Sequence, residues 1–141
     1  MTEKNYDEAL ILFEELAREN ENSELAPKAL FECAKLYQGK VLKNLGENES
    51  LVKSVRVYKS IFEKYPSHDE AENSLFMAGF ILANDLNDLD AAKSTYELYL
   101  EKYPNGQLAD DARVELENLG KSPEEILLEK IRKDTEDEKS I

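Results

Sequence analysis

The side chains best suited to covalent or metal chemistry are the single cysteine, Cys33, and the single histidine, His68. A nucleophilic or metal-binding site needs a second ligand or a base at a defined spacing, and neither residue has another Cys or His near it. Cys33 lies among alanines and leucines and is predicted to be a small buried hydrophobe. His68 lies in the acidic first turn of a predicted helix. We therefore predict no catalytic, metal or cofactor site at either residue.

Carboxylates are the other chemically capable groups, and some occur as adjacent pairs such as Asp110-Asp111 and Glu124-Glu125. Both pairs lie in the first turn of a predicted helix, where the helix dipole favours negative charge. No glycine-rich loop follows a strand to hold a phosphate group. We predict that the protein is not an enzyme and uses no cofactor.

The overall charge limits the classes of partner. Lys and Arg number 18 and Asp and Glu 31, which gives a formal net charge of −13. Such a field repels nucleic acid and anionic lipid, so the expected partner is a neutral or basic protein segment. The first residues lack the basic and apolar segments of a signal peptide, and no stretch is long enough to cross a bilayer. Taken alone, the chain would be cytoplasmic.

The segments that must position these groups are helical. With 141 residues, 41% of them hydrophobic, the chain suits one domain, and its 4 Pro and 5 Gly fall mostly at segment ends. Residues 75–83 contain no polar side chain, so their helix should lie at the centre of the molecule. Apolar spacings of three and four predict an all-α fold with a single helical domain over residues 1–133. Its helices are expected at 6–19, 24–45, 50–64, 68–84, 89–102, 108–119 and 123–133, followed by a charged flexible tail at 134–141.

The ends of two helices carry specific signals. Ser67 and Glu70 have the capping-box spacing, which predicts a helix start at His68. Ser122 before a proline predicts a capped start for the last helix, and Gly120 predicts a left-handed stop for the helix before it.

The helices form a repeat. Ala26, Ala71 and Ala109 correspond to one another, and the helices before them carry Phe13, Tyr58 and Tyr96 at equivalent places. The interval from Ala26 to Ala71 is longer than the next one, which extra turns in the second helix would explain. Each unit is therefore a pair of helices.

This pattern resembles the tetratricopeptide repeat. Ala92, Tyr96 and Pro104 fall where that family places its alanine, aromatic residue and proline, whereas Tyr99 departs from the family's small residue. Residues 5–9 resemble the turn into the second helix of a repeat, so we expect this chain to be the C-terminal part of a longer protein. Tyr-Pro pairs at 65–66 and 103–104, each followed five residues later by Ala-x-x-Ala or Ala-x-x-Ser, are similar to the bacterial envelope branch. That branch includes the periplasmic protein of the Tol-Pal system and the repeat lipoprotein of outer-membrane assembly.

The resemblance implies a right-handed superhelical array of antiparallel helix pairs, whose concave face is lined by the second, fourth and sixth helices. The family's groove positions would be mostly apolar at one end and charged at the other, which disfavours recognition of a peptide carboxylate. Leu75 and Leu82 could instead simply pack against neighbouring helices. The groove positions are Leu30, Ala34, Tyr37, Leu75, Gly79, Leu82, Asp110, Arg113 and Glu117.

The resemblance also implies a function, that of a non-catalytic scaffold that binds a protein or peptide segment in its groove, in a bacterial cell-envelope assembly. The alternative is a structural or oligomerisation spacer of a larger repeat protein, without its own ligand groove. Uncapped terminal helices would allow self-association. If the chain is a piece of an envelope protein, it would be periplasmic or associated with the outer membrane.

Overall fold

The computed structural model describes residues 5–139, which form seven helices and no strand. No helix in this part of the chain is both long and apolar enough to cross a membrane. The helices are α1 (Tyr6–Glu19), α2 (Leu25–Gln38), α3 (Glu47–Lys64), α4 (Asp69–Asn84), α5 (Leu89–Lys102), α6 (Ala109–Asn118) and α7 (Pro123–Lys139).

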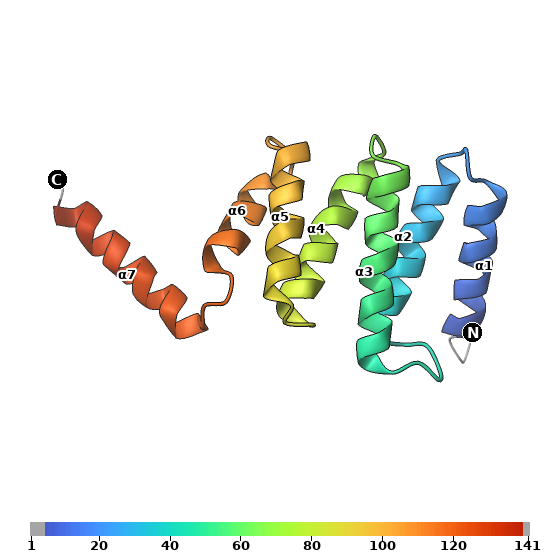
Figure 1. The fold of residues 1–141 in the computed structure, drawn as a ribbon, viewed down its shortest axis with the longest axis horizontal. Helices are drawn as coiled ribbons and strands as arrows, with labels where there is room; N and C mark the ends of the chain where they lie inside the picture. Colours follow the sequence, from blue (N-terminus) through green and yellow to red (C-terminus); the bar gives the residue numbers. More distant parts are fainter. Residues whose placement is uncertain (1–4, 140–141) are drawn as a thin grey trace.

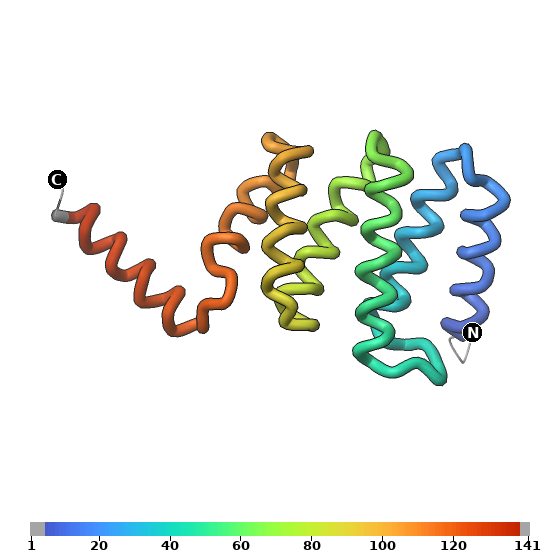
Figure 2. The backbone as a smooth tube through the Cα atoms, in the orientation of Figure 1, coloured from blue at the N-terminus to red at the C-terminus, as the bar shows by residue number. Residues whose placement is uncertain are grey.

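Helices α1 to α6 follow one another in a row along the molecule. Each packs against the next helix and runs antiparallel to it (Figure 1). Helices α3 and α5 lie in one layer, whereas α2, α4 and α6 lie in the other, and α2 also contacts α4 directly. Helix α7 leaves this row and extends away from the body of the molecule (Figure 2). The fold is an all-α solenoid, as predicted.

The centre of the solenoid is α4, as its long apolar run predicts. Leu75, Ala78 and Ile81 of this helix are at most 1% exposed and form a core with side chains from α3 and α5. Gly79 belongs to the same face, because a β-carbon there would lie only 3.0 Å from the ring of Tyr96. Its missing side chain lets α5 approach α4 closely.

The second helix is shorter than predicted, and the expected continuation to residue 45 is wrong. Helix α2 ends at Gln38, and Lys40 takes a left-handed φ of 56°, which an α-helix cannot continue through. Leu42 of the loop is buried, and the Lys43 N–H donates to the Asp7 carboxylate at 3.3 Å. The longer first interval of the repeat therefore comes from an anchored loop and from a longer α3, of 18 residues against 14 in α5, and not from extra turns of α2.

The two predicted helix starts have different outcomes. His68, not Ser67, caps α4, and its Nδ1 accepts the Glu70 N–H at 3.0 Å. The predicted cap of α7 is confirmed, because Ser122 Oγ accepts the Glu125 N–H at 3.1 Å. Gly120 has a φ of 80°, so the predicted left-handed stop of α6 is also confirmed.

Helix α7 continues through residues 134–139, where a flexible charged tail was expected. Glu and Lys are good helix formers, so a high charge density does not by itself end a helix. Thr135 also bonds back to the Ile131 carbonyl at 2.9 Å. Residues 140–141 of the predicted tail lie outside the described residues.

The Tyr-Pro pairs join successive repeats. The Tyr65 hydroxyl donates to the Glu21 carbonyl at 2.8 Å, and the Tyr103 hydroxyl donates to the Pro66 carbonyl at 3.1 Å. Each tyrosine ends a helix of one repeat and reaches into the turn of the preceding one. The pattern that marks the repeat in the sequence therefore has a direct structural role.

Tyr99, which departs from the family pattern, fixes the turn between α5 and α6. Its hydroxyl donates to the Glu72 carboxylate of α4 and accepts the Leu108 N–H at 3.0 Å. A β-carbon on Gly106 would overlap with both Glu72 and the Tyr99 hydroxyl. A tyrosine is accommodated here because the glycine leaves room for its bonded hydroxyl.

Tyr58 and Tyr96 occupy equivalent places in two repeats but differ in hydrogen bonding. Both are at most 1% exposed, and each ring lies 5.6 Å from the phenylalanine of the preceding helix. The Tyr58 hydroxyl donates to Gln38 Oε1 at 2.6 Å. Ala83 replaces that glutamine in the next repeat, and the Tyr96 hydroxyl has no partner among the described residues.

Because of this difference, we expect the same Tyr→Phe substitution to affect stability differently at positions 58 and 96. Tyr58→Phe should lower the free energy of unfolding by about 1 kcal/mol, because it leaves the Gln38 acceptor unbonded. Tyr96→Phe should leave stability unchanged or raise it, because it removes a hydroxyl that is buried without a bond. Urea unfolding followed by circular dichroism measures both. Equal losses of unfolding free energy in the two variants would contradict a hydrogen bond at Tyr58 and none at Tyr96.

Candidate protein-binding surface

Four of the predicted groove residues are core residues. Ala34 and Gly79 are buried, and Leu75 and Leu82 are only 1% and 6% exposed. Ala34, Leu75 and Leu82 belong to the cluster that joins α2, α3, α4 and α5. Leu75 and Leu82 therefore pack against neighbouring helices and fill the space between the helix layers, instead of lining an open groove.

The remaining groove residues do not share an open face. Leu30 is half-buried and packs with a small cluster of alanines between α1 and α2. Tyr37 is half-buried, and Lys53 Nζ lies 6.0 Å from its ring centroid. Arg113 is exposed, pairs with Asp110 at 2.9 Å and donates to the Pro104 carbonyl at 2.8 Å. Glu117 pairs with Lys133 of α7 at 2.7 Å.

Each of α2, α4 and α6 has an apolar side chain with exposed surface one residue after a predicted groove position. Phe31, Phe76 and Val114 are equivalent in the three repeats, and Phe80 lies one turn beyond Phe76. Phe31 and Phe76 are half-buried, whereas Phe80 and Val114 are 36% and 53% exposed. We call these four residues the apolar strip. Each residue turns a helix by about 100°, so a shift of one position separates a core face from an open face.

Phe31 and Phe76 pack against the core without being fully enclosed, and the family's groove positions do not include them. The signal that could have identified them is the repeat itself. Two phenylalanines and a valine recur at one position of the repeat, five residues after its first alanine. The Phe31 ring contacts Tyr58, and the Phe76 ring contacts both Tyr96 and Tyr99, so each ring is only partly covered by the core.

A cleft continues the apolar strip toward α1. It has a volume of about 310 Å³ and is bounded by α1, α2 and the first turn of α4. Leu16 and Leu25 are 37% and 46% exposed at this cleft. We call it the α1–α2 cleft; its lining is Phe13, Leu16, Leu25, Lys28, Ala29, Phe31, Glu32 and Glu70.

The charges around the cleft are of both signs. Lys35 pairs with Glu32 at 2.9 Å, and its Nζ lies 5.4 Å from the centroid of the Phe31 ring. Glu70 lines the cleft from α4. A larger hollow of about 630 Å³ lies near the start of α7, but polar side chains such as Asn84 and Asn87 contribute much of its wall. The α1–α2 cleft is more apolar than this hollow.

The chemically capable residues have structural roles. Cys33 is 1% exposed, as predicted, and burial raises the pKa of its thiol to about 12, with the charge of Glu14 adding to the effect. Such a thiol is a poor nucleophile at neutral pH. His68 uses Nδ1 to cap α4. Among residues 5–139, no group of three or more His, Cys, Asp or Glu side chains could hold a metal ion.

Comparison with known proteins identifies one helical pair. Residues 73–106 match the tetratricopeptide repeat, and this range contains most of α4, all of α5 and the second Tyr-Pro pair. The all-α solenoid therefore contains a tetratricopeptide repeat, a class of module that generally mediates protein–protein interaction. No curated protein and no solved structure matches the chain. The narrower resemblance to the envelope branch stays a prediction.

Proposed function

We propose that this protein is a non-catalytic interaction scaffold that binds an apolar segment of a partner protein in the α1–α2 cleft and along the apolar strip. The observation that carries the proposal is the set of large apolar side chains at this surface that folding leaves partly uncovered. Leu16, Leu25 and Phe80 are each more than a third exposed. Exposed large apolar groups that gather on one surface, as Leu16 and Leu25 do at the cleft, often mark an interaction site.

The dimensions and charge of the surface indicate the kind of partner. A cleft of about 310 Å³ suits one or two large side chains of a bound segment rather than a whole domain. Phe31 and Phe76 would supply aromatic contacts in the adjoining strip, as helix-in-groove recognition uses. The net charge of −13 favours a neutral or basic segment and an association rate that falls as salt rises.

The residues predicted from the family resemblance would then act indirectly. Leu75, Gly79 and Leu82 support the strip from beneath, because they hold α4 against its neighbours. Leu30 and Tyr37 would lie outside the contact surface. The Tyr-Pro pattern makes bacterial envelope assemblies the first place to search for the partner.

A matched pair of variants tests the surface. Leu16 and Leu25 are replaced together by Ser, and Val52, which is 44% exposed on α3, is replaced by Ser as the control. We expect the cleft variant to capture the partner from cells of the source organism at least about tenfold less than wild type, because burial of two leucine side chains is lost. The control should bind normally, and capture is compared at equal amounts of folded protein, with the melting temperature of each variant measured alongside.

The segment of the captured partner that binds is then purified. Its dissociation constants for the wild type, the cleft variant and the control complete the test. Equal binding by the cleft variant would reject the site. An association rate that does not change with salt would reject the proposed role of charge.

A further inference from the structure

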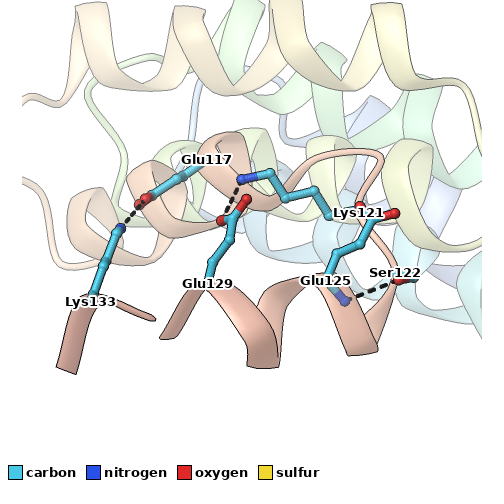
Figure 3. A network of polar contacts seen from close by, with 6 residues as sticks. All are labelled: Glu117, Lys121, Ser122, Glu125, Glu129 and Lys133. Atoms are coloured by element: carbon cyan, nitrogen blue, oxygen red, sulfur yellow. Dashed lines mark hydrogen bonds and ion pairs between the residues drawn. The ribbon is translucent and has the colours of Figure 1, made fainter. Parts of the chain in front are cut away.

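Helix α7 is joined to the solenoid by ion pairs rather than by an apolar core. Lys121 pairs with Glu129 at 2.8 Å, and Lys133 pairs with Glu117 of α6 at 2.7 Å (Figure 3). Beyond these contacts the helix extends away from the row formed by α1 to α6 (Figure 1). Its remaining faces are open.

The sequence of α7 explains why it does not pack as α5 does. Counted from the helix start, the positions where α5 buries Tyr96 and Tyr99 are occupied in α7 by Lys130 and Lys133. Lysines are rarely buried, and Lys130 has no ion-pair partner among residues 5–139, so α7 does not close over α6 in the manner of the preceding pair.

The apolar residues of α7 lie on an open face. Leu127, Leu128 and Ile131 are 57%, 61% and 52% exposed, and their spacing puts them on one side of the helix. Glu124 precedes Leu128 by one turn, and Arg132 follows it by one turn. Neither charge has a partner within residues 5–139. We call these five residues the α7 face.

We propose that the α7 face pairs antiparallel with the α7 face of a second copy of this chain, around a two-fold axis at Leu128. The face is self-complementary in charge. When two such helices lie antiparallel, Glu124 of each copy lies beside Arg132 of the other, and the apolar residues meet between the two ion pairs. Symmetry of this kind is the commonest in protein dimers.

The shape of the molecule permits this contact and limits its strength. Because α7 projects from the body, much of its length lies away from the other helices and can be reached by a second copy (Figure 2). A helix of 17 residues is about 25 Å long. One helix pair of that length buries less than the roughly 1,200 Å² of a standard interface, so we expect a weak dimer with a micromolar or higher dissociation constant.

Dimerisation would give the protein two copies of the α1–α2 cleft, one at each far end of the assembly, because α1 and α7 lie at opposite ends of the molecule (Figure 1). A partner with two binding segments would then be held more tightly than by one copy. The dimer contact itself does not depend on the proposed partner-binding function.

Charge exchange tests the contact. Sedimentation of the full chain from micromolar to millimolar concentration should show a monomer–dimer equilibrium. Glu124→Arg or Arg132→Glu should each weaken it by at least about tenfold, because two ion pairs become two like-charge contacts. The two variants mixed together should dimerise like wild type, because each restores opposite charge to the other, and so should the double exchange.

A cysteine placed on the axis tests the geometry. Leu128→Cys should form a disulfide-linked dimer on mild oxidation, since the two thiols meet at the axis. Asp137→Cys, on the opposite side of α7, is the control and should stay monomeric. The buried Cys33 does not compete. A monomer at all concentrations, a dimer that ignores the charge reversals, or equal cross-linking at the two positions would each overturn the proposal.

Discussion

Raising the pH above about 10 should unfold this protein cooperatively. Tyr58, Tyr96 and Tyr99 are at most 1% exposed, and burial raises the pKa of each phenol above its usual value of 10.0. For Tyr99 the hydrogen bond to Glu72 raises the pKa further. The native state therefore keeps these phenols protonated where the unfolded chain ionises them.

The sign and size of the effect follow from the protons released on unfolding. Stability from these groups is fully present below pH 10 and is lost as the pH rises from there toward the folded pKa values. Each phenol that stays protonated in the native state contributes a loss of about 1.4 kcal/mol per pH unit, so three together contribute about 4 kcal/mol per unit. A domain whose free energy of unfolding is about 5–15 kcal/mol should therefore unfold within a few pH units above pH 10.

Urea unfolding at a series of pH values from neutral to strongly alkaline measures this slope, and phenolate absorbance measures the tyrosine ionisation directly. Tyr96→Phe is the internal control, because removal of one phenol should reduce the slope by about a third. Ionisation of all the tyrosines near pH 10, with the helix content unchanged, would show that these phenols are not held protonated by the fold.

Leu75→Ala should lower the free energy of unfolding by about 2–5 kcal/mol, because Leu75 is 1% exposed and its removal leaves a cavity at the centre of α4. In a repeat array each unit is stabilised by its neighbours, so a loss at α4 affects the packing of α3 and α5 as well. The whole unfolding transition should move to lower denaturant concentration. This result would assign Leu75 to the core and not to a ligand groove.

Leu128→Ala is the matched control, since the same side chain is removed at a site that is 61% exposed. It should change monomer stability by less than about 0.5 kcal/mol. Chemical denaturation at a concentration below dimerisation compares the two. A larger loss at Leu128 than at Leu75 would mean that the centre of the solenoid lies elsewhere.

Much of the fold was predictable because the information is local. Apolar spacing, Ser122 at the start of the last helix and Gly120 after the sixth each act within a few residues, so the helix pairs could be recognised. The central position of α4 follows from a run with no polar side chain, which must be covered on several sides. The repeat of Ala71, Tyr96 and the Tyr-Pro pairs identified the class of array.

The candidate binding surface depends on tertiary packing. Leu75 and Phe76 are adjacent and both apolar, and only the position of α5 decides which is enclosed and which keeps an exposed edge. Likewise, Val41 and Leu42 fit a helix by pattern, but the loop is fixed by burial of Leu42 and by a distant contact from Asp7.

The sequence by itself determined where most helices form and that they pair as a repeat, because helix formation and capping depend on near neighbours. The direction of α7 and the open face of the array were decided only in the tertiary structure. Lys130 and Lys133 stand where α5 has buried tyrosines, and α7 is joined to α6 by an ion pair with Glu117 instead of by an apolar core. Both the direction of α7 and the open face depend on which surfaces remain open after the other helices have packed, and a pattern of neighbouring residues does not determine that.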